Sequence, residues 1–117
     1  MKLPLIPNLI LSAALLFAGN GAFAHDDATL DKMKRDGEKI ASITCYDASF
    51  GVLVDAAGAD VVLVGDSLGM VLQGHDTTVP VTMDEMVYHC RATARGIHRP
   101  LLMADLPFAS FPTKEIA

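Results

Sequence analysis

Apolar side chains occur along residues 30–117 in two alternating patterns, as short uninterrupted runs and as longer stretches with helical spacing. Uninterrupted runs are typical of strands covered on both faces, and apolar residues three or four positions apart are typical of helices. The patterns predict helices over 30–35, 49–57 and 82–96, with another beginning at 113, and strands over 40–44, Val61–Val64 and Leu101–Ala104. Strands that alternate with helices in this way indicate a parallel α/β sheet.

Glycines and a capping motif mark the ends of these helices. Gly37, Gly58 and Gly96 follow the last apolar residue of the three patterns, where glycine commonly ends a helix. Thr82 and Glu85 form a capping box at the start of the third helix. The spacing also predicts a buried face for the second helix and for the third, made of Phe50, Leu53, Val54 and Ala57, and of Met86, Cys90 and Ala94.

The number of predicted strands sets the expected architecture. Three strands open a parallel sheet, but they cannot close a (β/α)₈ barrel, which takes about 250 residues. We therefore expect the opening part of a parallel sheet or barrel, truncated after about three strands. Residues 65–80 form a polar, glycine-containing connection that is too long for a simple turn, and such loops often carry function.

Composition limits the chain to one globular domain at most. It has 117 residues, of which 51% are hydrophobic and 6% aromatic, as in an ordered α/β protein. The net charge of −5 argues against a nucleic-acid partner, which would call for a basic patch. Cys45 and Cys90 lack the spacing of a zinc site or a disulfide framework, so we expect two buried thiols.

Residues 1–24 have the organisation of a secretory signal peptide. A lysine follows Met1, residues 9–17 are apolar, and Ala-Phe-Ala at 22–24 precedes a cleavage position. The apolar stretch is too short for a stable membrane anchor. The alternative is a spurious amino-terminal extension. In either case residues 25–117 are expected to form the partial (β/α) domain. Residues 25–27 (His-Asp-Asp) could bind a metal, but at a new amino terminus we expect a solvated tail.

Two of the predicted strands end at a carboxylate. Asp66 and Ser67 follow Val61–Val64, and Asp105 follows Leu101–Ala104. Because the carboxyl ends of parallel strands form the ligand-binding rim, the two aspartates are expected to converge on one ligand or cation. An aspartate after a strand is more often a turn or helix-cap residue, and the strand pattern alone leaves that alternative open.

Four segments of the chain carry a family resemblance, namely TCYDASF at 44–50, VGDSLGM at 64–70, QGHDTTVPVT at 73–82 and ADLPF at 104–108. Their order and spacing closely resemble the amino-terminal part of the ketopantoate hydroxymethyltransferase family. The resemblance implies a (β/α)₈ TIM barrel of the phosphoenolpyruvate mutase type, usually assembled as a homo-decamer. It also implies transfer of a hydroxymethyl group from 5,10-methylenetetrahydrofolate to 3-methyl-2-oxobutanoate, which gives 2-dehydropantoate for pantothenate biosynthesis.

The same resemblance assigns roles to the residues at the strand ends. Asp66 and Asp105 would hold Mg²⁺, which stabilises an enolate of the 2-oxo acid. Asp66, Ser67 and Asp105 would also contact that substrate. The family's general base, a third carboxylate and a lysine would lie beyond Ala117, so the chain alone is expected to be inactive. A folate-dependent reaction favours the cytoplasm, whereas a functional leader would favour export.

Two other interpretations stay open. Residues 65–68 read GDSL, the signature of a secreted serine esterase family in which Ser67 would be the nucleophile. The Gly-x-Asn-Asp block and the Asp-x-x-His pair of those enzymes do not occur in the chain. The second alternative is an inactive fragment that binds oxo acids. Tyr46 is expected near the site, Asp47 is equally well explained as a turn residue, and no catalytic role is assigned to His75, Asp76, His89 or His98.

Overall fold

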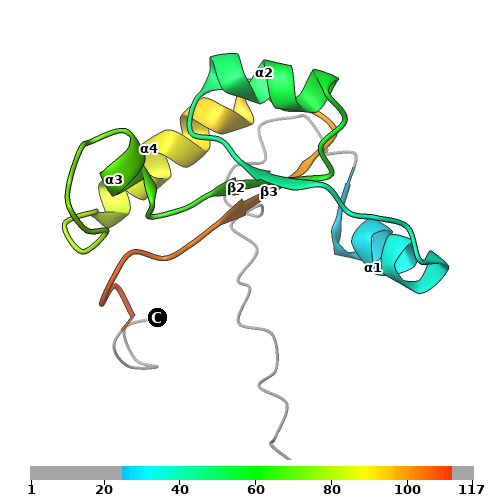
Figure 1. The fold of residues 1–117 in the computed structure, drawn as a ribbon, viewed down its shortest axis with the longest axis horizontal. Helices are drawn as coiled ribbons and strands as arrows, with labels where there is room; N and C mark the ends of the chain where they lie inside the picture. Colours follow the sequence, from blue (N-terminus) through cyan, green and yellow to red (C-terminus); the bar gives the residue numbers. More distant parts are fainter. Residues whose placement is uncertain (1–24, 112–117) are drawn as a thin grey trace, which may run out of the picture.

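The structure is a computed structural model, and it describes residues 25–111 (Figure 1). The predicted leader at 1–24 and the helix expected from residue 113 lie outside the described residues. The described part alternates helices and strands, as the sequence predicts. Its elements are α1 (Asp27–Asp36), β1 (Ser42–Thr44), α2 (Ala48–Ala56), β2 (Val61–Val64), α3 (Leu68–Val71), α4 (Met83–Ala94) and β3 (Leu101–Ala104).

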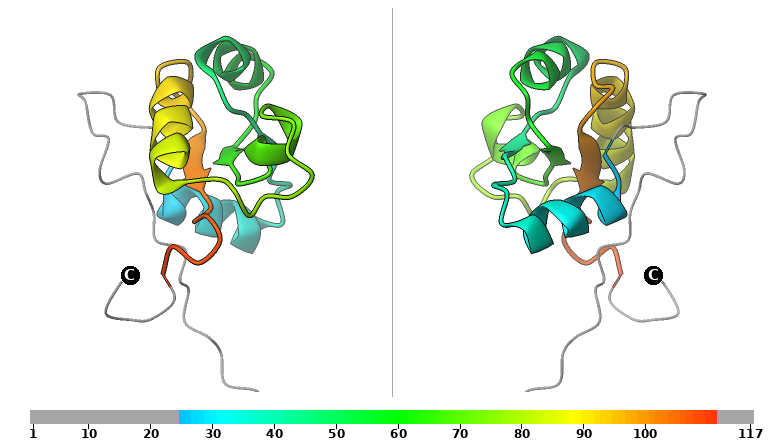
Figure 2. Two further views of the ribbon diagram at one scale, coloured as in Figure 1. Left: turned by 90° about the vertical axis from the view of Figure 1, so that its left-hand side faces the viewer. Right: turned by 90° about the vertical axis from the view of Figure 1, so that its right-hand side faces the viewer.

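The three strands form one parallel sheet in the order β1-β2-β3. Ile43 pairs with Val62 of the next strand, and Val62 pairs in turn with Leu102. Helices α2 and α4 lie over the same face of the sheet (Figure 1, Figure 2). On the opposite face Leu63 and Met103 remain partly exposed. The α/β class and the parallel sheet predicted from the sequence are therefore confirmed.

The hydrophobic core lies between the covered face of the sheet and α4. Val64 and Leu102 contribute from the sheet, and Met86 and Cys90 contribute from α4. Ala94 packs against this cluster, so the buried face predicted for the helix over 82–96, which is α4 in the structure, is confirmed. Both cysteines are buried free thiols, as expected.

The predicted helix ends are also confirmed. Gly37 has a φ of 73° at the end of α1, and Gly58 has a φ of 92° after α2, in the left-handed region that glycine adopts without strain. Helix α4 begins with the expected capping box. The Glu85 N–H donates to Thr82 Oγ1 at 3.3 Å, and the Thr82 N–H donates to the Glu85 carboxylate at 2.7 Å.

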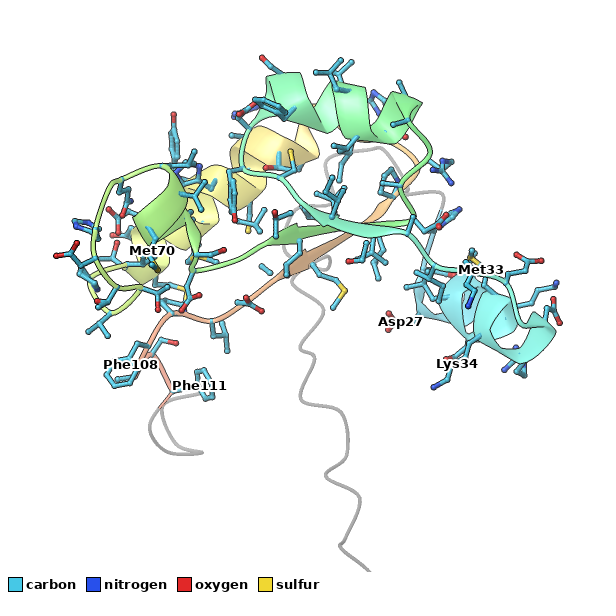
Figure 3. All side chains as sticks on the ribbon, in the orientation of Figure 1. Asp27, Met33, Lys34, Met70, Phe108 and Phe111 are labelled. Carbon is cyan, nitrogen blue, oxygen red and sulfur yellow. The ribbon has the colours of Figure 1, made fainter. Side chains whose placement is uncertain are left out.

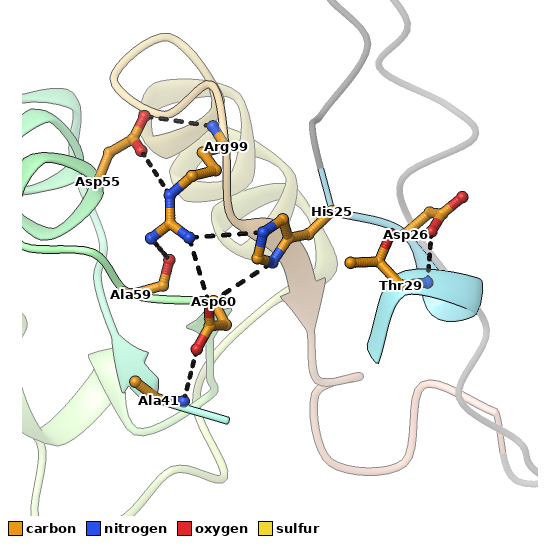
Figure 4. Close-up of polar contacts among 8 residues, drawn as sticks. All are labelled: His25, Asp26, Thr29, Ala41, Asp55, Ala59, Asp60 and Arg99. Carbon is orange, nitrogen blue, oxygen red and sulfur yellow. Dashed lines mark hydrogen bonds and ion pairs between the residues drawn. The ribbon is translucent and has the colours of Figure 1, made fainter. Parts of the chain in front are cut away.

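Helix α1 begins earlier than the sequence pattern predicts, and the expectation of a solvated tail at 25–27 is wrong in part, because Asp26 and Asp27 are exposed but belong to the helix and its cap. Asp26 caps the helix, because its Oδ1 accepts a hydrogen bond from Thr29 N–H at 2.8 Å (Figure 4). An aspartate at this position satisfies an N–H group that the first helical turn leaves free. His25 is only partly exposed, and its backbone N–H donates to Arg99 O at 2.9 Å. His25, just before the helix cap, is therefore packed against the domain.

Arg99 joins this start of α1 to the sheet (Figure 4). Its guanidinium donates to Asp60 Oδ1 at 3.2 Å and to Ala59 O at 2.5 Å. Its Nε lies 4.0 Å from the carboxylate of Asp55, and His25 Nδ1 lies 3.7 Å from Asp60 Oδ1. The cluster sits where β2 and β3 begin, so it is at the opposite end of the strands from Asp66 and the other predicted site residues.

The buried face predicted for α2 is wrong in part. Phe50 and Leu53 are each 62% exposed and Ala57 is exposed, whereas Gly51 is buried and Val54 packs against the core. A Cβ on Gly51 would lie 3.2 Å from the backbone that follows α4. The missing side chain lets α2 approach α4 closely, and an apolar pattern does not reveal a contact made by a glycine.

Two further boundaries differ from the prediction. The connection at 65–80 contains the short helix α3, and β1 is shorter than the strand predicted over 40–44. Both are short elements, whose ends sequence patterns locate least well. Within residues 25–111, no helix combines the length and the apolar character that crossing a membrane requires.

Candidate functional site

The ends of β2 and β3 bring the three predicted site residues together. Asp105 extends the ladder beyond β3, because its N–H donates to Val64 O at 3.0 Å. It therefore lies beside Gly65, and Asp66 and Ser67 follow directly in the chain. A Cβ on Gly65 would lie 3.1 Å from Asp105 Oδ2 and 3.1 Å from Ser67 Oγ. The carboxylate and the hydroxyl thus flank one glycine, whose missing side chain leaves room for both.

The two carboxyl groups at this point influence each other. Partial burial raises the pKa of Asp105 above its ordinary value of 3.8, and the negative charge of Asp66 raises it further. The Asp105 side chain is exposed, so solvent screens much of this repulsion. Repulsion between two carboxylates is the electrostatic environment that a bound cation would relieve.

The chemistry of this donor set fits a hard divalent cation. Mg²⁺ is usually held by one or two carboxylates, with waters and substrate oxygens completing its octahedral shell. Asp66 and Asp105 would supply those carboxylates. No group of three or more His, Cys, Asp or Glu side chains suited to a metal occurs within residues 25–111.

Ser67 is held by a residue at the end of β1. Its Oγ lies 2.8 Å from the phenol oxygen of Tyr46, which is a buried side chain. Ser67 precedes α3, yet its side chain makes no capping hydrogen bond to that helix. Serine is a favoured helix-capping residue, but here its hydroxyl pairs with Tyr46 instead of the helix.

Helix α4 holds the backbone that carries this phenol. His89 Nδ1 lies 2.8 Å from Tyr46 O, and the Thr93 hydroxyl donates to Cys45 O at 3.4 Å. A carbonyl oxygen only accepts, so His89 Nδ1 carries the proton in this contact. Both carbonyls follow β1, where the sheet ladder no longer provides a donor. The side chains of α4 thus fix the end of β1 above the core.

The surroundings of the strand ends combine apolar and polar side chains. Met70 on α3 and Phe108 after β3 are 49% and 68% exposed, and both lie at this end of the sheet (Figure 3). Helix α1, marked by Asp27, lies at the other end (Figure 3). The long loop after α3 is tied to α4, because Gln73 Nε2 donates to Glu85 Oε1 at 2.9 Å.

The pairing of Tyr46 with Ser67 and the contact of His89 are not predicted by the sequence. No local pattern relates the ends of two strands, although Tyr46 directly follows an apolar strand, as the predicted site residues do.

The turn interpretation of Asp47 is confirmed, since its Oδ1 accepts from Phe50 N–H at 2.9 Å at the start of α2. The three remaining polar residues of interest are exposed, namely His75, Asp76 and His98.

Comparison with known proteins gives a consistent family. Residues 26–117 match the family described as ketopantoate hydroxymethyltransferase. A Shewanella loihica protein named 3-methyl-2-oxobutanoate hydroxymethyltransferase is 58% identical over 90 residues, which cover 77% of this chain and 34% of the relative. A Nitrosococcus oceani protein of the same name is 58% identical over 84 residues, covering 72% of this chain and 32% of the relative.

A third relative with this name, from Shewanella amazonensis, is 57% identical over 88 residues, covering 75% of this chain and 33% of its own length. The chain spans about one third of the length of the curated relatives it matches. The matched region contains all of the strand ends described above. The chain belongs to the ketopantoate hydroxymethyltransferase family.

Proposed function

We propose that the protein, at the length of its relatives, transfers a hydroxymethyl group from 5,10-methylenetetrahydrofolate to 3-methyl-2-oxobutanoate. The observation that carries the proposal is the convergence of Asp66, Ser67 and Asp105 around Gly65. The names of the relatives support the same reaction. The product would be 2-dehydropantoate, a precursor of pantothenate.

The proposed architecture is a (β/α)₈ TIM barrel of the phosphoenolpyruvate mutase type. It is supported by the parallel order β1-β2-β3, with α2 and α4 on one face and partly exposed Leu63 and Met103 on the other. In a barrel the helices lie outside and the opposite face of the sheet lines the interior. The site at the carboxyl ends of the strands is where enzymes of this architecture bind substrate.

The residues at the strand ends would bind different groups, the two aspartates the metal ion and Ser67 the oxo acid. Asp66 and Asp105 would hold Mg²⁺, and when bound this cation would supply positive charge that favours loss of a proton beside the keto group. Ser67 would donate a hydrogen bond to the carboxylate of the oxo acid. Its hydroxyl pairs with a phenol within residues 25–111, rather than with a histidine, and this favours a binding role over that of an esterase nucleophile.

The cellular setting is part of the same proposal. We place the activity in the cytoplasm, where methylenetetrahydrofolate is available, and we propose the homo-decamer implied by the family. Fusing residues 1–30 to a reporter that is active only after export tests the location. An inactive reporter is expected, and export with cleavage after Ala24 would contradict a cytoplasmic enzyme.

The reaction can be tested with a full-length fusion, defined as residues 25–117 of this chain followed by the unmatched remainder of the Shewanella loihica relative. With Mg²⁺, methylenetetrahydrofolate and 3-methyl-2-oxobutanoate, mass spectrometry should detect 2-dehydropantoate. Asp66→Asn and Asp105→Asn should each abolish most turnover and weaken Mg²⁺ binding measured by calorimetry. A folded fusion without product, whose Ser67 is labelled by a fluorophosphonate, would instead support the esterase interpretation.

A further inference from the structure

We propose that Tyr46 is a positioning residue for the oxo-acid site, and that His89 holds it in place from α4. In this arrangement the Tyr46 phenol orients the hydroxyl of Ser67 toward a bound carboxylate. The inference rests on the proposed function, because it assumes that Ser67 meets the carboxylate of a 2-oxo acid. It adds two residues whose contacts connect the core-packed helix α4 to the rim of the sheet.

The direction of the Tyr46–Ser67 hydrogen bond follows from acidity. Their oxygens are 2.8 Å apart, and either could donate. A phenol is a far stronger acid than an aliphatic alcohol, so it is the better donor and the poorer acceptor. When Tyr46 donates to Ser67 Oγ, the serine proton remains free. That proton can then be donated to an anionic ligand, and such charge-assisted hydrogen bonds are stronger than neutral ones.

Two features of the surroundings keep this arrangement in place. Tyr46 is buried, with 9% of its surface exposed, so the side chains packed around it restrict the movement of its ring. Its backbone carbonyl accepts from His89 Nδ1 at 2.8 Å, which fixes the position from which the side chain leaves β1. The Ser67 side chain makes no capping hydrogen bond to α3. Within the described residues, the contact with Tyr46 is therefore the hydrogen bond that orients its hydroxyl.

The experiment uses the full-length fusion with Mg²⁺ present and measures the dissociation constant of 3-methyl-2-oxobutanoate by calorimetry, separately from turnover. Tyr46→Phe keeps the ring and removes the donor, so affinity for the oxo acid should fall about three- to tenfold, the usual effect of one hydrogen bond. Binding of Mg²⁺ without oxo acid should not change. The matched control is Tyr88→Phe, which removes a phenol from a side chain that is 68% exposed and should leave both constants unchanged.

A double-mutant cycle separates positioning from a general structural role. If Tyr46 acts through Ser67, then Tyr46→Phe should have no further effect on affinity in a Ser67→Ala protein. Independent, additive losses would overturn the proposal, as would an unchanged affinity in Tyr46→Phe alone. A fusion that binds the oxo acid without turnover would overturn the proposed reaction while leaving this cycle decisive. A fusion that binds no 2-oxo acid would overturn both.

His89 provides a second pair of variants that does not alter the phenol. His89→Asn places an amide N–H near the position of Nδ1, so oxo-acid affinity should stay close to that of the unsubstituted fusion. His89→Ala removes the donor, and affinity should fall about twofold or more. Equal affinities in the two variants would contradict the role of His89. Circular dichroism and thermal melting confirm that each variant is folded before its affinity is compared.

Discussion

Asp66 and Asp105 follow different strands, yet the charge on Asp66 raises the pKa of the Asp105 carboxyl, which partial burial has already raised. Without a cation, the folded protein therefore holds two carboxylates whose mutual repulsion opposes folding. The same repulsion prepares the pair for a divalent cation, because binding exchanges it for attraction. The Asp66–Asp105 repulsion should therefore affect both the stability of the metal-free protein and its binding of a divalent cation.

The first prediction concerns pH. A carboxyl whose pKa is raised by folding keeps its proton longer in the folded state, so the free energy of unfolding decreases as pH rises from 3.8 through the raised pKa. In the metal-free fusion, Asp105→Asn should remove this contribution and increase stability at neutral pH. Urea unfolding across that pH range measures the difference. A neutral-pH loss of stability in Asp105→Asn would show that the carboxylate is stabilised by a contact other than Asp66.

The second prediction concerns Gly65, which separates the Asp105 carboxylate from the Ser67 hydroxyl. In Gly65→Ala the new methyl group would lie 3.1 Å from both, closer than ordinary van der Waals contact, so one or both must move. We expect kcat/KM for the oxo acid to fall about tenfold, because displacing a substrate-positioning group by about 1 Å can cost about 100-fold. The stability loss should be about 1 kcal/mol.

A control for this variant is Gly58→Ala, which strains a left-handed position at the opposite end of the strands. It should lower stability by about 1–2 kcal/mol and leave kcat/KM of the folded enzyme unchanged. Full activity in Gly65→Ala would mean that the site tolerates the added methyl group, and that the glycine is not needed for its geometry.

Much of this fold follows from local sequence signals. Strand β2 is an uninterrupted apolar run whose three valines are buried, and the Thr82–Glu85 capping box fixes the start of α4. Such signals depend on neighbours in the chain, so they can be recognised without knowing the fold. The buried face of α2 depends instead on Gly51 meeting the backbone after α4. The packing of His25 depends on Arg99, far along the chain, and no periodicity reports such contacts.

The site divides in the same way. A parallel sheet places the ends of its strands at one edge, so the strand pattern could bring Asp66 and Asp105 to the same edge, although it left a turn or cap role open for each. The Tyr46–Ser67 contact requires knowing which side chain leaves β1 toward β2, and the His89 contact requires knowing how α4 lies over β1. Both depend on tertiary packing. The sequence therefore predicts residues that could contact a ligand, such as Asp66, more readily than residues that position those side chains, such as Tyr46.

The third prediction concerns the start of α4. Thr82→Ala removes the hydroxyl that accepts from Glu85 N–H and donates to the Glu85 carboxylate. Loss of a threonine cap typically lowers the free energy of unfolding by about 1 kcal/mol. Because Glu85 also accepts from Gln73, hydrogen exchange of the loop at 73–81 should become faster. Ser49→Ala, at an exposed position of α2, is the control, and equal effects of the two variants would contradict a capping role.

The last prediction concerns the Arg99 cluster, where the start of α1 meets the strands. Asp55 accepts from the His98 N–H at 2.6 Å and lies beside the Arg99 guanidinium, and Asp60 accepts from both Ala41 N–H and Arg99. The Ala41 hydrogen bond, followed by Arg99, lowers the pKa of Asp60 despite its burial. A lowered pKa stabilises the fold above the ordinary value of 3.8, and this contribution is lost as pH falls through the lowered pKa.

Arg99→Met keeps much of the aliphatic volume but removes the guanidinium from Asp55 and Asp60. Breaking a fully buried pair costs about 3–5 kcal/mol, and because Arg99 is about one third exposed we expect about 2–3 kcal/mol. Urea unfolding of the fusion should show this loss, with a smaller loss for Arg99→Lys and none for the exposed Arg95→Met. Binding of Mg²⁺ in the folded variant should not change, since the cluster lies at the opposite end of the strands from Asp66 and Asp105. A loss of Mg²⁺ affinity in folded Arg99→Met would mean that the two ends of the sheet are energetically coupled, which the separation of the two clusters argues against.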